Sequence, residues 1–318
     1  MIRRESHQVG IADAFVRPPN TEHILDKINH LVNWEPLRRK MEGFYSSSGP
    51  GRPAFPVVTL FKAVLLQNWH NLSDPATEEA IDDRLSFRRF LGLNMDEKSP
   101  DHSTLHRFRD RIAPVMDELF QMVNAQLAAH QLMVKQGTIV DATLIRSQAR
   151  QPQKGNSDSD PDARWGRKKN ALTFGYKGHV GMDQHSELIR QADLTPANVH
   201  DGGRFEAMVS GDEAMVYTDK GYYGRRRSRW LQERGIGDGI MAKGCRWQPE
   251  ISREQAARNR AISQVRSAVE RVFGTLKRIY RYGRCRYYNL WRNRCNFLVL
   301  CICYNLRRAV KLCECRRA

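Results

Sequence analysis

The sequence lacks any long hydrophobic run, and this argues against a membrane protein. Its longest apolar stretch extends only from Phe297 to Cys303, which is far too short to span a bilayer. The first residues, from Met1 to Gln8, include charges but no following apolar segment, so we expect no signal peptide. We therefore expect a cytoplasmic protein with no membrane partner.

Cysteine is absent before position 245, and all 7 cysteines lie between Cys245 and Cys315. No two have the C-x-x-C spacing of a zinc knuckle, and their odd number does not suggest a disulfide framework. We expect reduced thiols, partly buried in a C-terminal helix. The sequence also lacks a G-x-x-x-x-G-K-[ST] motif, so no nucleotide cofactor is expected.

Charge is distributed very unevenly along the 318 residues. The net charge is +17, yet residues 1–137 carry 17 basic and 17 acidic groups. From Ile251 onward there are 17 basic residues and only 3 acidic ones, with aromatic side chains such as Tyr287 and Trp291 between them. A basic segment with interleaved aromatics favours a polyanionic partner, and nucleic acid is the leading candidate. Phosphate contacts would supply affinity without sequence specificity.

The first 135 residues or so have the pattern of a helical domain. Apolar residues recur at helical spacing over 20–45 and again from Val57 to Trp69. A segment rich in Ser, Gly and Pro, residues 46–53, separates these runs and predicts a linker. Ser73 has the character of a helix N-cap, and a further helix is expected from about Pro100 to Met133.

The pattern changes at Gly137 to that of a mixed α/β domain. Short β-branched segments predict five strands, at 138–145, 173–182, 188–194, 214–218 and 239–242. Residues 150–171 are polar and predict a loop. Helices are expected over 225–234, 253–279 and 292–312. This order predicts a five-stranded mixed sheet with flanking helices.

Two aspartates lie where this sheet would hold them. Asp141 is inside the first predicted strand, where an unpaired carboxylate is costly, and Asp219 directly follows the fourth. Glu270 is a third candidate, on the helix that also carries Arg266 and Lys277 on the same face. A divalent cation would compensate such carboxylates.

Several motifs in a fixed order resemble the DDE insertion-sequence transposases of bacteria, over nearly the whole chain. In the helical half they include Gly51-Arg-Pro53, Phe87-Arg-Arg-Phe-Leu-Gly92 and Pro100-Asp-His-Ser-Thr104. In the second half they are Val140-Asp-Ala-Thr143, Phe174-Gly-Tyr-Lys-Gly-His179, Thr195-Pro-Ala-Asn-Val-His-Asp201, Thr218-Asp-Lys-Gly-Tyr222, and Arg266 with Glu270 and Lys277. Relatives often carry Tyr three residues before the arginine, where this chain has Ser263.

The resemblance implies an RNase H-like catalytic domain over 136–318, preceded by a helical domain over 1–135. It implies that Asp141, Asp219 and Glu270 are both the catalytic residues and the ligands of two Mg²⁺ ions, for which Mn²⁺ can substitute. Such an enzyme hydrolyses phosphodiester bonds at the element's terminal inverted repeats and joins the 3′-hydroxyls to target DNA. Arg266, Lys277 and Lys177 would contact the DNA.

Other interpretations remain open. The same acidic residues would serve a nuclease without strand transfer, and a DNA-binding protein that has lost catalysis is a third hypothesis. Because residues 1–137 carry no net charge, this domain binds DNA through a local patch, such as Arg107 and Arg109, or else mediates dimerisation. A run of arginines at 225–229 fits a phosphate site and a solvated helix face equally well. A homodimer associated with the bacterial nucleoid is expected.

Overall fold

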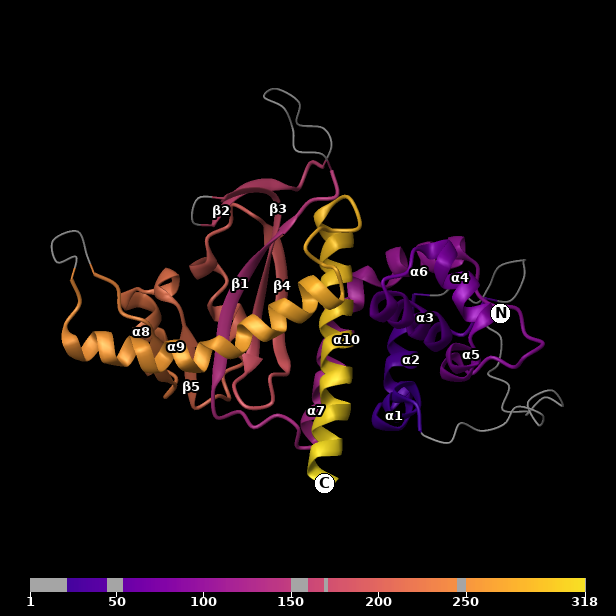
Figure 1. Ribbon diagram of the computed structural model, residues 1–318, viewed down its shortest axis with the longest axis horizontal. Helices are drawn as coiled ribbons and strands as arrows, with labels where there is room; N and C mark the ends of the chain where they lie inside the picture. The colour runs from indigo at the N-terminus through magenta and orange to yellow at the C-terminus, as the bar shows by residue number, and fades with distance from the viewer. Residues whose placement is uncertain (1–21, 45–53, 150–159, 169–170, 245–249, 318) are drawn as a thin grey trace. The chain divides into compact units, whose positions relative to one another are not determined.

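The computed structural model describes residues 22–44, 54–149, 160–168, 171–244 and 250–317 (Figure 1). The chain divides into two compact units. Unit 1 comprises Met1–Gln126 together with Leu298–Ala318, and unit 2 comprises Leu127–Phe297. This division differs from the predicted one, which assigned all of residues 136–318 to the catalytic domain.

Unit 1 is helical in the residues described. Its first helices are α1 (Ile24–Leu31), α2 (Trp34–Glu42), α3 (Val57–His70), α4 (Asp74–Asp83) and α5 (Leu85–Leu91). They are followed by α6 (His102–Ile112), the short 3-10 helix η2 (Ala113–Val115) and α7 (Met116–Ala129). The predicted helix over 20–45 is thus two helices, and the one over 100–133 is interrupted at Pro114, which lacks the backbone donor of a helix interior. The predicted linker at 46–53 lies outside the described residues.

Helix α3 forms the centre of unit 1, because every residue from Val57 to Trp69 is buried. The last helix, α10 (Leu290–Arg317), brings an apolar run from the other end of the chain into this unit. The indole Nε1 of Trp69 donates to the carbonyl of Cys303 over 2.9 Å. Cys301 and Cys303 are buried, as expected for thiols of a C-terminal helix.

Unit 2 contains a six-stranded mixed sheet in the order β2-β3-β1-β5-β6, with β4 also paired to β3. Its strands are β1 (Thr138–Arg146), β2 (Arg164–Lys168), β3 (Ala171–Asp183), β4 (Ile189–Pro196), β5 (Met215–Thr218) and β6 (Gly237–Ile240). β1, β3 and β4 pair antiparallel, whereas β5 and β6 run parallel to β1. Without β2, this is the order and direction of an RNase H-like sheet.

The prediction of five strands omitted β2, which lies in the segment predicted to be a loop. Its sequence, Arg-Trp-Gly-Arg-Lys, has no apolar alternation that could indicate a strand. It forms because it pairs with β3, from Arg164 opposite Gly175 to Lys168 opposite Ala171. The five strands that were predicted are confirmed, with bounds that differ by a few residues.

The two faces of the sheet pack differently. On one face an apolar cluster includes Val140 of β1, Val216 of β5, Phe205 and Leu231 of α8 (Arg225–Gln232). Helix α9 (Arg253–Gly274) packs against β1 and β5, and Figure 1 shows it running across the sheet. Ser252 and Gln255 form a capping box at its start, and the π-helical turn η6 (Thr275–Ile279) extends it. Among the described residues, no helix has the length and apolar character to cross a membrane.

Candidate active site

The parallel pairing of β1 with β5 places the two predicted aspartates at neighbouring positions. Thr138 pairs with Val216 and Ile139 with Tyr217, a constant offset of 78 residues. The same offset relates Asp141 to Asp219, which directly follows the end of β5. The two central strands therefore place Asp141 and Asp219 at neighbouring register positions.

Asp219 is fixed by a tight turn. It is the N-cap of the 3-10 helix η5 (Lys220–Tyr222), and its Oδ1 accepts the backbone N–H of Gly221 over 2.8 Å. The carbonyl of Asp219 accepts the N–H of Tyr222 over 3.2 Å. The Thr218-Asp-Lys-Gly-Tyr222 motif is thus a rigid strand end that presents one carboxylate.

Helix α9 and the π-helical turn η6 that extends it are each attached to β1 at one point. Nη2 of Arg266 donates to Oδ2 of Asp141 over 2.9 Å, and Nζ of Lys277 donates to the carbonyl of Leu144 over 2.8 Å. Glu270, one turn beyond Arg266 on the predicted shared face, is exposed. The structure therefore brings Arg266 to Asp141 and places the third carboxylate on the same helix.

The donor chemistry at this site suits a hard divalent cation, because carboxylate oxygens are the ligands that Mg²⁺ and Mn²⁺ prefer. Within the described ranges, no three His, Cys, Asp or Glu side chains lie together as a ready-made metal site. Here Asp141 is instead ion-paired with Arg266, whose side chain is only 15% exposed. A cation at Asp141 would have to displace this guanidinium.

Two further residues belong to this acidic region, although they were not among the predicted site residues. Burial raises the pKa of Tyr222 well above its ordinary value, and the charges of Asp141, Asp201 and Asp219 raise it further. Its hydroxyl therefore stays protonated among three carboxylates. Tyr222 and Asp201 both end motifs that support the family resemblance, so the motifs themselves were the available signal.

Lys177 lies on β3, and its ammonium group is bound by other residues of unit 2. Its Nζ donates to the carbonyl of Val199 over 2.7 Å and forms an ion pair with Asp201 over 2.7 Å. Lys177 thus holds the segment that carries Asp201.

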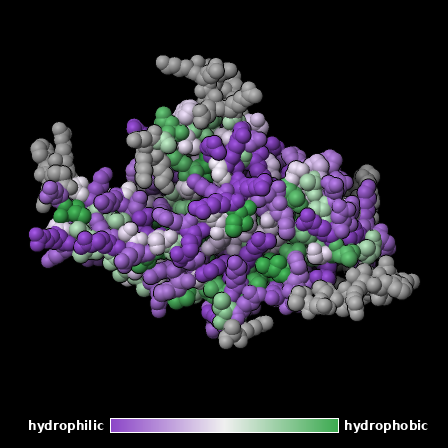
Figure 2. All heavy atoms as spheres, viewed as in Figure 1, coloured by the Kyte–Doolittle hydropathy of each residue, from purple (hydrophilic) through white to green (hydrophobic). Residues whose placement is uncertain are grey.

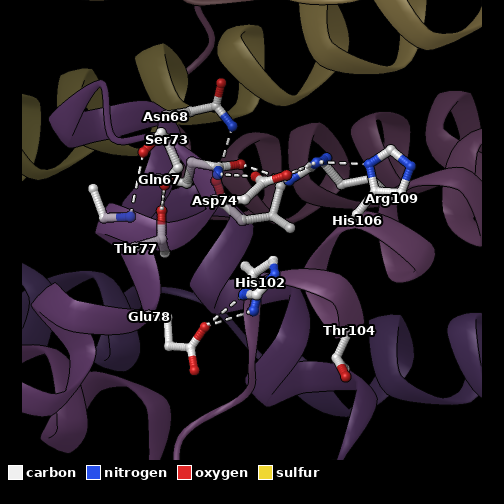
Figure 3. Close-up of polar contacts among 12 residues, drawn as sticks. Gln67, Asn68, Ser73, Asp74, Thr77, Glu78, His102, Thr104, His106 and Arg109 are labelled. Carbon is white, nitrogen blue, oxygen red and sulfur yellow. Dashed lines mark hydrogen bonds and ion pairs between the residues drawn. The ribbon is translucent and has the colours of Figure 1, made fainter.

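Arg107 and Arg109, the arginine patch predicted on α6, have opposite surroundings. Arg109 is 7% exposed, and its guanidinium binds both carboxylate oxygens of Asp74 over 2.6 Å and Oε1 of Gln67 over 2.9 Å (Figure 3). Arg107 is exposed and donates to the hydroxyls of Ser103 and Thr104. The predicted DNA contact fits Arg107, whereas Arg109 is a structural cation because its donors face the interior of unit 1.

The arginine run at 225–229 is partly used within unit 2. Arg227 donates to the carbonyls of Tyr222 and Gly202, and Arg226 pairs with Glu206 over 2.8 Å. Arg225 and Arg229 are exposed. Hydrophilic residues predominate on the face shown in Figure 2, with small scattered hydrophobic groups. Within this run, Arg227 therefore stabilises the turn that contains Tyr222, whereas Arg225 and Arg229 form an exposed basic surface.

This arrangement defines a class of protein, an RNase H-like domain with acidic residues at its two central strands. Residues 133–306 match the family described as "Transposase DDE domain", and residues 13–111 match "Transposase domain (DUF772)". The chain belongs to the DDE transposase family.

Two solved structures are similar to the chain. One is a piggyBac transposase synaptic complex with hairpin DNA, with 11% identity, a TM-score of 0.48, and coverage of 92% of this chain and 74% of that one. The other is a pre-cleavage Mos1 transpososome, with 8% identity, a TM-score of 0.20, and coverage of 93% and 98%.

Proposed function

We propose that this transposase binds the terminal inverted repeats of an insertion sequence, hydrolyses phosphodiester bonds at the element ends, and joins the 3′-hydroxyls to target DNA. The observation that carries this proposal is the register of β1 and β5, together with the attachment of α9 at Asp141. In support, Asp141 lies on β1, Asp219 directly follows β5, and Glu270 lies on α9, which packs against both strands.

Asp141, Asp219 and Glu270 would hold two divalent cations, Mg²⁺ or Mn²⁺. When bound, such ions supply an activated nucleophile and stabilise the oxygen that leaves phosphorus. Asp141 is anchored by strand β1 and Asp219 by the η5 turn, and cation binding at Asp141 would require displacement of Arg266. Glu270 is exposed on α9, so it would complete the site from the helix side.

Arg266 has two roles in this proposal. It now neutralises Asp141, and it would turn to a DNA phosphate when a cation takes over that carboxylate. Lys277 holds α9 to β1 through the carbonyl of Leu144, so it would approach the DNA only near that strand. Lys177 would act mainly by holding Asp201.

The partners in this proposal are double-stranded DNA and a second copy of the chain. Two element ends have to be processed together, which is the reason to expect a homodimer. Unit 1 would supply DNA contacts through exposed cations such as Arg107, or the dimer contact.

The test is cleavage of labelled linear DNA carrying the element's own ends, with Mg²⁺ or Mn²⁺ and a target plasmid. Wild type is compared with Asp219→Asn, which keeps an oxygen for the Gly221 N–H. Asp238→Asn is the matched control, because Asp238 lies on the adjacent strand β6 and pairs with Arg258. We expect metal-dependent cutting at the ends and joined products, both lost in Asp219→Asn and kept in Asp238→Asn.

Other outcomes would identify the alternative functions. Cutting that ignores the end sequences and yields no joined products would indicate a nuclease. Specific binding of the ends without cleavage under either metal would indicate a DNA-binding protein, and the catalytic roles of the three acids would then be withdrawn.

A further inference from the structure

Strand β2 and the first part of β3 form a two-stranded ribbon that extends beyond β1. Strand β1 ends with Arg146 opposite Gly175, whereas β2 pairs with β3 from Gly175 to Ala171. The ribbon is defined here as residues 164–168 and 171–175, and Figure 1 shows it at one end of the sheet. Strand β2 is also the edge strand in the order of the sheet. The ribbon is thus the part of the sheet where β1 no longer covers β3.

One face of the ribbon combines an arginine with exposed apolar side chains. Trp165 pairs with Phe174 and Arg167 with Leu172, and side chains paired in this way share a face. The ring centroids of Trp165 and Phe174 lie 5.5 Å apart, in agreement with this register. Trp165 is 43% exposed, Leu172 is 63% exposed, and Arg167 is exposed as well. Aromatic and arginine side chains are enriched where a protein contacts a partner, so this face has the character of an interface.

The charge of the ribbon indicates the chemistry of its partner. Residues 164–182 contain 5 basic residues and no acidic one. A second copy of the chain that paired along β2 would bring this basic strand against itself, and like charges placed opposite each other destabilise a sheet. A polyanion would instead be attracted, and the major groove of DNA admits a two-stranded ribbon. The charge therefore favours DNA over a second copy of the chain.

The exposed face of the ribbon is the same face of the sheet that carries Asp141. Asp141 pairs with Val180 of β3, and Val180 and Phe174 are six residues apart, so their side chains lie on one face. Six residues of a strand span about 20 Å, which corresponds to about six base pairs of DNA. A duplex that runs along the strands from Asp141 would therefore reach the ribbon about half a helical turn away.

The start of α10 adds a second aromatic and basic group next to the ribbon. Asp162, two residues before β2, accepts the N–H of Leu290 through Oδ2 over 2.7 Å. The next residue, Trp291, is exposed, and the guanidinium of Arg292 lies 4.8 Å from the centre of its ring. All of these residues belong to unit 2. The aromatic and basic surface thus continues from the ribbon onto the first turn of α10.

We propose that the ribbon is a DNA-binding surface that holds the duplex about half a helical turn from the acidic site. This inference rests on the proposed function. Arg167 donates to a phosphate, and the exposed ring of Trp165 packs against a deoxyribose. Contacts of this kind fix the register of the duplex without reading its sequence. The ribbon thereby determines which phosphate lies at the acidic site.

The test is binding of a labelled duplex that carries the element end, measured by fluorescence anisotropy over a range of salt concentrations without divalent cations. Arg167→Gln should weaken binding about tenfold and reduce the slope of log Kd against log salt by about one, because one phosphate contact is lost. Trp165→Ala should weaken binding at every salt concentration with the slope unchanged, since an indole displaces no counterions. Trp165→Phe should restore most of the affinity, because it keeps an aromatic ring beside Phe174.

The matched control is Arg234→Gln, which removes the same charge from the other face of the sheet. The guanidinium of Arg234 lies 4.1 Å from the centre of the Trp230 ring, and Trp230 packs against the apolar cluster that contains Val140. Val140 and Asp141 are adjacent in β1, so their side chains lie on opposite faces. Arg234→Gln should bind the duplex like the wild type. Both arginine variants should keep the wild-type melting temperature, because both arginines are exposed.

Three results would overturn the inference while the wild type still binds the element ends. They are an unchanged salt slope in Arg167→Gln, equal weakening in Arg234→Gln, and wild-type affinity in Trp165→Ala. A change in the sedimentation coefficient of Trp165→Ala without loss of DNA affinity would assign the ribbon to contact between copies of the chain. If the wild type does not bind the element ends, the proposed function itself fails.

Discussion

Arg266 occupies the carboxylate that a catalytic cation would need. Its Nη2 lies 2.9 Å from Oδ2 of Asp141, and the two side chains are only 15% and 20% exposed. A hydrogen bond to a charged group contributes roughly 1.5 kcal/mol or more, and this corresponds to about tenfold in an equilibrium constant. Arg266 and a divalent cation should therefore compete for Asp141.

This competition predicts that Arg266→Gln binds Mn²⁺ more tightly, by about tenfold, because the variant removes the competing charge. The same variant should bind element ends more weakly if Arg266 turns to a phosphate. Mn²⁺ titration and DNA mobility shift measure the two effects separately. Arg271→Gln is the control, since Arg271 lies on α9 and pairs with Glu187 instead of Asp141. Unchanged Mn²⁺ affinity in Arg266→Gln would contradict the prediction.

The individual residues of the site were predictable to different degrees. Asp141 and Asp219 could be predicted because a carboxylate in a strand is costly and the motif order is specific. Tyr222 was signalled only by its place in the Thr218-Asp-Lys-Gly-Tyr222 motif, because the sequence does not show whether a tyrosine hydroxyl is buried or has a partner. The ion pair that joins Asp141 to Arg266 links residues 125 positions apart, so no local pattern contains it.

Within unit 1, helices α3, α4 and α6 are joined through the buried side chain of Arg109, which pairs with the partly exposed Asp74. Asp74 begins α4 after the N-cap Ser73, and Arg109 on α6 binds both Asp74 and Gln67 of α3 (Figure 3). Burial opposes ionisation of Asp74, but the Arg109 hydrogen bonds and charge outweigh it, so the pKa of Asp74 is lowered. Both partners are therefore charged at neutral pH.

Arg109→Ala should destabilise unit 1 by about 1.5 to 3 kcal/mol, since it removes the charged hydrogen bonds of a buried arginine to the partly exposed Asp74 carboxylate. Arg107→Ala, two residues away and exposed, should change the free energy of unfolding by less than about 0.5 kcal/mol. Urea denaturation followed by circular dichroism gives both values. Equal effects of the two substitutions would show that the pair of Arg109 and Asp74 does not stabilise the helices.

Elements were predictable where local sequence determines them. Local sequence predicted the start of α4 through the Ser73 cap and predicted α3 through its apolar run. It also predicted β1 and β5 through their β-branched residues. It did not predict strand β2, because the hydrogen bonds of this strand depend on β3. The membership of Leu298–Ala318 in unit 1 could not be predicted either, since this segment bonds to Trp69, which is far away in the sequence.

At the scale of the whole molecule, buried histidine links stability to pH. Burial lowers the pKa of His179 to about 4; nearby Asp201 and Asp193 raise it by less, and Lys177 and Arg204 lower it further. Its Nε2 contacts the Thr195 hydroxyl over 2.9 Å. The unfolded chain takes up this proton near pH 6.5, whereas the folded protein does so only near pH 4.

The contribution of His179 to the free energy of unfolding should therefore be fully present above about pH 6.5 and be lost as the pH is lowered toward 4. This loss should amount to up to about 3 kcal/mol. The free energy of unfolding, measured between pH 4 and 7, tests this. His179→Gln should show a shallower slope over this window, because it has no proton to gain. The same slope in variant and wild type would assign the acid sensitivity to other groups.

The discontinuous composition of unit 1 has a consequence for synthesis of the protein. Trp69 and Cys303, joined by a hydrogen bond of 2.9 Å, are 234 residues apart. Chains fold from the N-terminus as they leave the ribosome, so the whole of unit 2 emerges before Leu298–Ala318 reaches unit 1. Closure of so long a loop is slow. Translation that stops before Leu298 would yield the acidic site without the segment that completes unit 1.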